Sequence, residues 1–93
     1  MFKVNEYFEG KVTSLAFETR EGKATIGVIA TGEYEFGTST IEYMTVTSGA
    51  MDVMIENETG WKTYKEFETF VVVANSKFKM RVKEDTSYRC FYR

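Results

Sequence analysis

The chain consists of short runs rich in valine, isoleucine, threonine, phenylalanine and tyrosine, and turn residues interrupt these runs every eight to twelve positions. Regular spacing of this kind is typical of a β-sandwich or a β-barrel. Apolar residues do not recur with the 3.6-residue period of a long amphipathic helix, so we expect at most one helical turn. The 93 residues suffice for a single hydrophobic core. We therefore predict one all-β domain over residues 1–93.

Turn-forming residues divide the chain into the expected strands. Because the sequence contains no proline, glycine, asparagine, aspartate and serine must make the turns. We expect a hairpin tip at Thr19–Gly22, and we expect the strands on either side of Ser48–Gly49 to pair with each other. The runs predict strands at Val12–Phe17, Lys23–Ala30, Tyr34–Phe36, Glu42–Thr47, Ala50–Ile55, Trp61–Tyr64, Thr69–Val73, Lys77–Val82 and Ser87–Tyr92.

Alternation along these strands assigns their faces, because successive side chains of a strand point to opposite sides. Segment Lys77–Val82, read KFKMRV, should place its apolar residues in the core and its basic residues outside. Glu42 shares a face with Met44 and Val46, which puts a carboxylate on an apolar face. Such burial is costly unless the carboxylate is paired or serves chemistry. The less charged face of the last strand, which we expect to be the inner one, carries Tyr88, Cys90 and Tyr92.

Segment Gly32–Gly49 resembles the first cupin motif, in which two histidines and a glutamate bind a metal inside a small β-barrel. Glu42 is followed by six residues and then Gly49, as in the second half of that motif. Thr38 and Thr40 hold the places of the histidines, and the chain contains no histidine at all. A lone carboxylate with hydroxyl groups is a poor site for a transition metal. We therefore expect no metal and no cofactor.

The chain resembles a family of small single-domain cupins, the pyrimidine/purine nucleoside phosphorylases, along nearly its full length. The resemblance implies a cupin jelly-roll barrel and a homodimer. It also implies that nucleosides of a broad range of bases are split with inorganic phosphate into the free base and ribose 1-phosphate. The segments that carry it, in the family's order and spacing, are Asn5–Val12, Gly32–Thr38, Met44–Ala50 and Thr86–Tyr92.

The sequence departs from the family pattern in the second cupin motif. Where the pattern has a glycine and then Pro-Gly, this chain has Phe67, Val73 and Ala74. The turn there must be made in another way, for which Asn75 is the candidate. Phe78 holds the place of the second motif's histidine, in agreement with the missing metal ligands of the first motif.

Glu42 is the candidate catalytic residue. Phosphorolysis needs a bound phosphate, stabilisation of positive charge on the sugar, and a proton or hydrogen bond for the departing base. Positioning and electrostatics can supply most of this without a metal. Glu42 could bind the ribose hydroxyls or stabilise the sugar cation. Alternatively, it is the remnant of a metal ligand that is now paired with a basic residue.

The candidate substrate-binding residues have hydroxyl, guanidinium or aromatic side chains. Thr38 and Thr40 could donate hydrogen bonds to phosphate, or could belong to an ordinary polar turn. Arg81 and Arg89 could bind phosphate through two hydrogen bonds each. Alternation puts both arginines on outer faces, where solvated arginine is the simpler interpretation. The aromatic candidates for stacking on a base are Tyr34 and Tyr88.

Charge and cysteine content restrict the partners and the compartment. The net charge of −2 argues against a nucleic-acid polymer, whose binding proteins are basic. No apolar run approaches the roughly 20 residues of a membrane span. Cys90 is the only cysteine, which fits a reducing compartment, so we expect a cytoplasmic protein. We expect Phe2–Phe8 and Phe91–Tyr92 to form the contacts of the homodimer, because subunit pairing covers exposed strand edges.

Three other functions remain open at this point. A cupin without catalytic activity would bind a small ligand such as a sugar or a nucleotide. A metal-dependent oxygenase or isomerase would contain bound iron or manganese. A purely structural role would need no cavity in the barrel. Incubation with uridine and phosphate, followed by chromatography for uracil, separates the phosphorylase from these alternatives.

Overall fold

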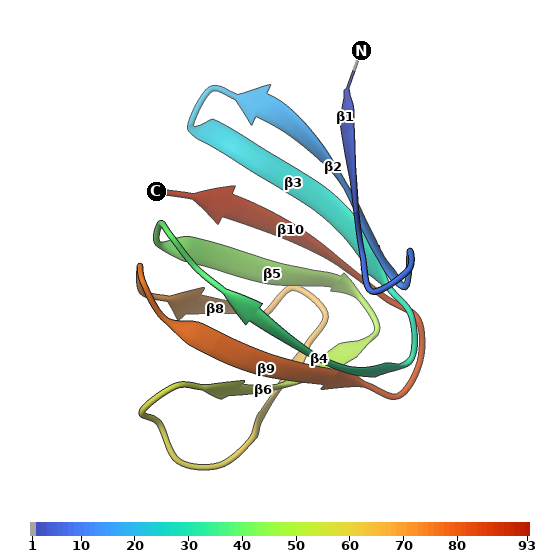
Figure 1. Cartoon of the computed structure of the whole chain (residues 1–93), viewed down its shortest axis with the longest axis vertical. Coiled ribbons are helices and arrows are strands. Elements are labelled where there is room, and N and C mark those ends of the chain that lie inside the picture. Colours follow the sequence, from blue (N-terminus) through green and yellow to red (C-terminus); the bar gives the residue numbers. More distant parts are fainter. Residues whose placement is uncertain (1) are drawn as a thin grey trace.

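The computed structural model describes residues 2–93 and has two antiparallel sheets that face each other (Figure 1). The order of strands is β1-β2-β3-β10-β5-β8 in the larger sheet and β4-β9-β6-β7 in the smaller sheet. Within the described residues no helix is present that could cross a membrane. The strands are β1 (Lys3–Tyr7), β2 (Val12–Thr19), β3 (Gly22–Ile29), β4 (Gly32–Gly37), β5 (Glu42–Ser48), β6 (Ala50–Ile55), β7 (Lys62–Lys65), β8 (Thr69–Val72), β9 (Lys77–Val82) and β10 (Thr86–Tyr92).

The predicted all-β fold is confirmed, and strands β2 to β10 lie within two residues of the predicted bounds. Strand β1 was not predicted. Its sequence, KVNEY, is mostly polar, and most of its side chains are exposed. The strand is therefore held in place by its pairing with β2 and not by burial of apolar side chains of its own. In the turn that follows, Phe8 has φ 53° and Glu9 has φ 60°. Phenylalanine and glutamate rarely adopt this left-handed conformation, so the sequence does not predict a turn there.

The prediction that the strands flanking Gly49 pair with each other was wrong. Strand β5 pairs with β10 and β8 in the larger sheet, whereas β6 pairs with β9 and β7 in the smaller sheet. Gly49 lies between them with φ 87°, and a Cβ atom there would lie 2.6 Å from Oγ1 of Thr86. The glycine thus allows a sharp bend that carries the chain from one sheet to the other.

The core lies between the two sheets and consists of the faces that alternation predicted to be apolar. On β9 the apolar side chains point inward and the basic ones outward. Met44 and Val46 of β5 are also buried, with Glu42 on the same face. The buried core residues are Val12, Ile29, Tyr34, Met44, Val46, Met51, Val53, Phe70, Val72, Phe78, Met80, Val82, Tyr88 and Cys90.

Two non-glycine residues make the turns where the family pattern has glycine and proline. Phe67 has φ 67° in the connection between β7 and β8, and its ring is 76% exposed. Asn75 has φ 57° in the connection between β8 and β9, and its backbone N–H donates to the carbonyl of Thr38. The expected role of Asn75 in this turn is thereby confirmed. Asparagine tolerates this conformation well, whereas phenylalanine adopts it at a cost.

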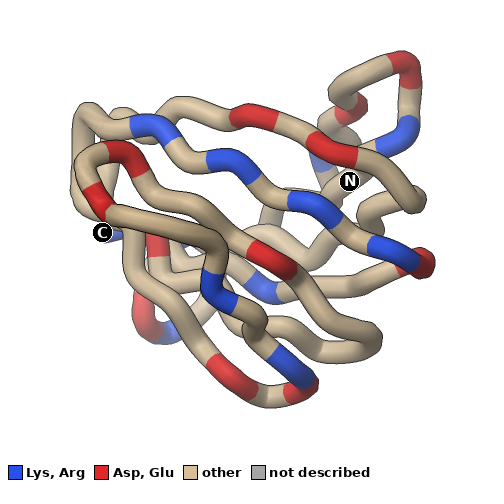
Figure 2. The backbone as a smooth tube through the Cα atoms, turned by 90° about the horizontal axis from the view of Figure 1, so that it is seen from below, with Lys and Arg blue, Asp and Glu red and all other residues tan. Residues whose placement is uncertain are grey.

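The outer face of the smaller sheet carries ordered rows of charge (Figure 2). Strand β9 directs Lys77, Lys79 and Arg81 outward. In the cross-strand register Arg81 lies between Glu33 of β4 and Asp52 of β6. Acidic and basic side chains therefore alternate across this face and balance each other.

Candidate functional site

A cavity of about 570 Å³ lies between the two sheets. Its walls come from β1 and the turn after it, from the inner face of the larger sheet, and from β4 and β9 of the smaller sheet. It is lined by Asn5, Tyr7, Phe8, Val12, Ser14, Thr25, Ile29, Glu35, Phe36, Gly37, Glu42, Met44, Phe78, Met80, Tyr88 and Tyr92. A cavity of this size falls in the range of small-molecule sites.

The larger sheet contributes a polar floor to this cavity. We use "polar floor" for Ser14, Thr25, Glu42, Tyr88 and Tyr92, which come from four adjacent strands, β2, β3, β10 and β5. The hydroxyls of Thr25 and Tyr92 are joined by a hydrogen bond of 2.9 Å. Because Tyr92 pairs with Glu42 in the β10–β5 register, the carboxylate lies at one end of this floor.

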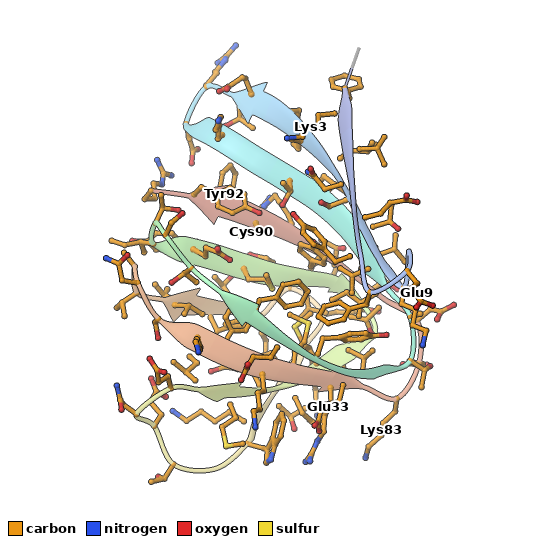
Figure 3. All side chains as sticks on the ribbon, in the orientation of Figure 1. Lys3, Glu9, Glu33, Lys83, Cys90 and Tyr92 are labelled. Carbon is orange, nitrogen blue, oxygen red and sulfur yellow. The ribbon has the colours of Figure 1, made fainter. Side chains whose placement is uncertain are left out.

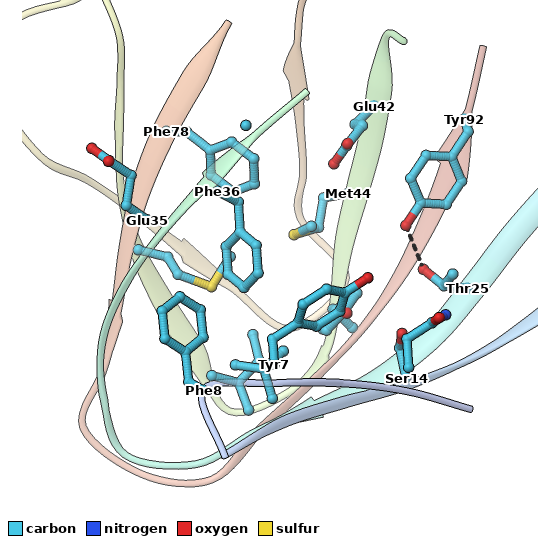
Figure 4. Close-up of a pocket in the computed structure, with 16 residues that line it drawn as sticks. Tyr7, Phe8, Ser14, Thr25, Glu35, Phe36, Glu42, Met44, Phe78 and Tyr92 are labelled. Atoms are coloured by element: carbon cyan, nitrogen blue, oxygen red, sulfur yellow. Dashed lines mark hydrogen bonds between the residues drawn. The ribbon is translucent and has the colours of Figure 1, made fainter. Parts of the chain in front are cut away.

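Aromatic rings form the opposite wall, for which we use the name "aromatic wall". Its members are Tyr7, Phe8, Phe36 and Phe78. The ring of Phe36 contacts the other three, with centroids 5.8 Å from Tyr7, 5.5 Å from Phe8 and 6.0 Å from Phe78. Figure 4 shows Phe8, Phe36 and Phe78 gathered on one side of the cavity, with Glu42, Thr25 and Tyr92 on the other.

Glu42 lies in the polar floor and faces the aromatic wall, and burial disfavours its charged form relative to a solvated glutamate. Burial raises the pKa of Glu42 above its usual value of 4.5, and a hydrogen bond from the Cys90 thiol lowers it only in part. The sulfur of Cys90 lies 3.7 Å from Oε1 of Glu42. No ion pair of Glu42 occurs within residues 2–93. The interpretation of Glu42 as a remnant paired with a basic residue therefore has no support in the described residues.

The phenols of the polar floor and the thiol of Cys90, which lies next to Glu42, are neutral at physiological pH. Burial raises the pKa of Tyr88 to about 12 and also raises that of Tyr92. Burial and the nearby charge of Glu42 raise the pKa of Cys90 to about 12, so its thiol is not a ready nucleophile. The tyrosine hydroxyls can donate and accept hydrogen bonds, and Glu42 is the carboxylic acid of the floor.

Of the predicted site residues, Glu42 and Tyr88 line the cavity, whereas Thr38, Thr40 and Tyr34 are not among its lining residues. The Thr38 hydroxyl donates to the carbonyl of Val73 at 2.7 Å and accepts from a backbone N–H, so its hydrogen bonds serve the loop. Thr40 is exposed in the connection between β4 and β5. The Tyr34 hydroxyl donates to the carbonyl of Ala30 at 2.8 Å.

The two predicted arginines lie on outer faces, as alternation indicated. Nε of Arg81 lies 3.0 Å from Oδ2 of Asp52, and its guanidinium stacks over Trp61 at 4.1 Å from the ring centroid. A hydrogen bond from Thr63 and another from Arg81 lower the pKa of Asp52. Arg89 is exposed on the outer face of β10. Neither arginine lines the cavity.

The charges in the cavity lining are all acidic. Glu42 contributes its carboxylate, whereas Glu35 lies on the outward side of β4 opposite Lys79 and its carboxylate points away from the cavity (Figure 4). No lysine or arginine occurs among the lining residues. Within residues 2–93 no three side chains of histidine, cysteine, aspartate or glutamate are grouped closely enough to hold a metal ion.

Sequence reasoning missed the hydroxyls of Ser14, Thr25 and Tyr92 and the N-terminal residues Asn5 and Tyr7 as cavity-lining groups. Ser14 and Thr25 occupy inward positions of β2 and β3 and are almost completely buried. A small hydroxyl at an inward position is the signal that could have identified them. Asn5 and Tyr7 could not be found in this way, because β1 itself was not predicted.

Comparisons with known proteins agree on one family. The profile of a family described as pyrimidine/purine nucleoside phosphorylase matches residues 2–92. A protein of that name from Pseudomonas fluorescens (strain Pf0-1) is 57% identical over 93 residues, which cover 100% of this chain and 99% of the relative. The crystal structure of a protein of unknown function from Vibrio parahaemolyticus is also similar, with a TM-score of 0.93 and 43% identity, covering 97% of this chain and 96% of the other.

A more distant structure confirms the predicted fold class. The EutQ protein of Clostridium difficile, a cupin, has a TM-score of 0.69 and 15% identity, and the match covers 87% of this chain and 61% of EutQ. At this identity the likeness concerns the fold alone. The two facing sheets are thus those of a cupin jelly roll.

Proposed function

Because the chain belongs to the pyrimidine/purine nucleoside phosphorylase family, we propose that it splits purine and pyrimidine nucleosides with inorganic phosphate. A phosphate oxygen forms a bond to the anomeric carbon of ribose, and the bond from that carbon to the base nitrogen breaks. The electron pair of the broken bond remains on the base. The proton that hydrogen phosphate brings is transferred to the base overall, so the products are the free base and ribose 1-phosphate.

The observation that carries this proposal is the division of the cavity into a polar floor, which contains Glu42, and an aromatic wall. A nucleoside has the same division, because its ribose is rich in hydroxyls and its base is flat. The polar floor can hydrogen-bond the sugar, and the aromatic wall can stack on the base. Stacking does not distinguish one base from another, which supports activity on both purines and pyrimidines.

Glu42 would act on the sugar in this arrangement. As the bond to the base breaks, positive charge develops on the ribose ring. A carboxylate placed beforehand in a partly dry site stabilises that charge without reorganising at the moment of reaction. Binding the nucleoside also removes water from the site, which strengthens this attraction.

Replacing Glu42 with glutamine tests this role, since the change keeps the shape of the side chain and removes its charge. We expect turnover to fall by roughly 10²–10³, the scale for removing one electrostatic group from an active site. The variant should remain folded, because it loses a partly buried charge. Product is measured as uracil released from uridine in the presence of phosphate, with Thr40→Val as a control outside the cavity. Unchanged turnover of the glutamine variant would show that Glu42 is structural.

The same assay decides between this enzyme and the alternatives. If the wild-type protein binds nucleosides but releases no base with phosphate present, it is a small-ligand-binding cupin. If activity disappears in a chelator and returns with iron, manganese or zinc, a metal takes part. We propose activity without a metal or other cofactor, because the two cupin motifs contain no histidine. Persistence of full activity in the chelator is the expected result.

The proposed assembly is a homodimer that joins two copies through the outer face of the larger sheet. Val4, Leu15 and Ile26 are neighbours in the β1–β2–β3 register and are 43–55% exposed. Burying such an apolar row against a second copy would stabilise the pair. Tyr92, which we expected at the contact, instead points into the cavity. Light scattering that finds only monomers at micromolar concentrations would contradict the homodimer.

The single cysteine supports a cytoplasmic location.

A further inference from the structure

The lining of the cavity that the proposed function assigns to the nucleoside contains no cationic group for the phosphate. Hydrogen phosphate carries two negative charges, and the lining residues offer the carboxylate of Glu42 but no cation. An anion placed beside Glu42 without a nearby cation would be repelled. A cationic group must therefore reach the reacting carbon from just outside the lining, and the register of the strands shows which groups can do so.

Lys23 lies on the inner face of the larger sheet, beside the polar floor. In the register Lys23 pairs with Glu18 of β2. On its other side it lies opposite Tyr92 of β10, because Thr25 pairs with Cys90 and each of the two residues lies two positions from that pair. Tyr92 in turn pairs with Glu42 of β5. Neighbouring strands are about 4.8 Å apart, so the Cα atoms of Lys23 and Glu42 are separated by roughly 10 Å. The long side chain of lysine can cover much of that distance.

Lys3 lies on the same face, one row further along. It pairs with Ala16 of β2, which in turn pairs with Thr25 of β3. On β1 it shares its face with Asn5 and Tyr7, both of which line the cavity. Because Ala16 is small, no bulky side chain separates Lys3 from the hydroxyl of Thr25. Figure 3 shows Lys3 on the upper part of β1, toward the same end of the molecule as Tyr92.

Both lysines are exposed, and neither forms an ion pair with any residue of the described chain. The other basic residues are directed elsewhere. Lys77 and Lys79 point outward from β9, Arg81 binds Asp52, and Arg93 binds Glu21. Lys62 on the edge strand β7 is paired with Glu58. Arg89, the third basic residue on a strand of the larger sheet, lies on the outer face of β10, so Lys3 and Lys23 are the basic residues of these strands that face inward.

We propose that Lys3 and Lys23 bind the phosphate co-substrate beside the cavity, next to the hydroxyls of Thr25 and Tyr92. The two ammonium groups supply the positive charge, and the hydroxyls supply hydrogen bonds to the phosphate oxygens. The phosphate then approaches the ribose from the side of the lysines, while Glu42 lies at the end of the same row. This inference rests on the proposed phosphorolysis and identifies the groups that hold its second substrate.

The test compares wild-type protein with the double variant Lys3→Gln/Lys23→Gln. Its matched control is Lys77→Gln/Lys79→Gln, which removes the same charge from the outer face of β9. Initial rates of uridine cleavage are measured over a range of phosphate concentrations at constant ionic strength. We expect the KM for phosphate to rise by about tenfold to a hundredfold in the first variant, the range for losing charge-assisted hydrogen bonds. The KM for uridine should change little, and the control should behave like wild type.

A second measurement does not depend on activity. Acetic anhydride acetylates accessible lysines, and mass spectrometry follows the rate at each position. Inorganic phosphate should slow acetylation of Lys3 and Lys23 and leave Lys79 unaffected. Wild-type activity combined with an unchanged KM for phosphate in the lysine variant would overturn this inference and leave the proposed function intact. A wild-type protein that releases no base would instead refute the proposed function.

Discussion

Substitution of Gly27 by alanine should damage both stability and activity, because the ring of Tyr88 occupies the space where a side chain would begin. A Cβ atom at position 27 would lie 2.5 Å from Cε1 and Cζ of Tyr88 and 2.6 Å from its hydroxyl oxygen. Comfortable contacts between such atoms are roughly 3.5–4.0 Å. The ring would have to withdraw by about 1 Å or more, yet it is only 7% exposed and packs in the core.

The expected loss combines two opposing terms. Overpacking a core costs about 1–3 kcal/mol. Alanine recovers about 0.4–1 kcal/mol by restricting the unfolded chain, since the backbone at Gly27 is not left-handed. The free energy of unfolding should therefore fall by about 1–2 kcal/mol, and the melting temperature by about 4–8 °C for each kcal/mol in a domain of this size. Displacing Tyr88 also disturbs the polar floor, so nucleoside cleavage should weaken.

Urea denaturation measures this effect, with Gly37→Ala as the matched control. Gly37 is also a strand glycine that lines the cavity, but a Cβ atom there would meet its nearest neighbour at an ordinary 3.8 Å. A double-mutant cycle with Tyr88→Leu isolates the contact, because removing the ring should abolish the penalty at position 27. If Gly27→Ala unfolds at the wild-type urea concentration, or if its effect persists without the ring, the clash is not the cause.

Two further predictions follow from Glu42 and Phe67. Burial raises the pKa of Glu42 in the folded state above its usual value of 4.5. Between these two pKa values the native protein retains a proton that the unfolded chain has released, so the free energy of unfolding falls as the pH rises through this range. The gain in unfolding free energy from Glu42→Gln should accordingly be larger at pH 7 than at pH 4, and an equal gain at both would contradict the raised pKa. Phe67→Gly should increase stability by about 0.5–1 kcal/mol, because glycine adopts φ 67° without strain and the exposed ring contributes little packing. Thermal unfolding checks this change, with Asn75→Gly as a control of smaller effect, and a lower melting temperature for Phe67→Gly would refute it.

Alternation predicted most of the fold because a strand with one buried face shows that face in its sequence. The inward positions of β9 and the apolar face that carries Glu42 could both be identified in this way. Strand β1 could not, because its partner β2 holds it rather than burial of its own residues. The pairing of β5 with β6 was expected from sequence proximity alone. Gly49 can close a hairpin or bend the chain into another sheet, and only the remaining strands decide between the two.

The candidate site was less predictable because it is assembled across strands. Alternation predicts which face of the sheet each side chain occupies, but it does not predict which residues of neighbouring strands lie beside one another. Thr25, Tyr92 and Glu42 lie on β3, β10 and β5, and the register alone brings them together. Thr38 and Thr40 were expected to bind substrate because their hydroxyls could donate hydrogen bonds to phosphate. In the structure the hydroxyl of Thr38 is used to hold the neighbouring loop, and Thr40 faces solvent.

The position of β10 has a consequence for how the chain reaches its folded state. This strand is the last one in the described chain, yet it lies in the interior of the larger sheet, between β3 and β5 (Figure 1). A nascent chain that has completed β3 and β5 cannot join them until β10 has emerged from the ribosome. Until then both strands expose unpaired backbone edges, which makes the growing chain prone to aggregation. The larger sheet therefore cannot close before residues 86–92 have been synthesised, and a loss of β10 would split the sheet through its middle rather than shorten it at one side.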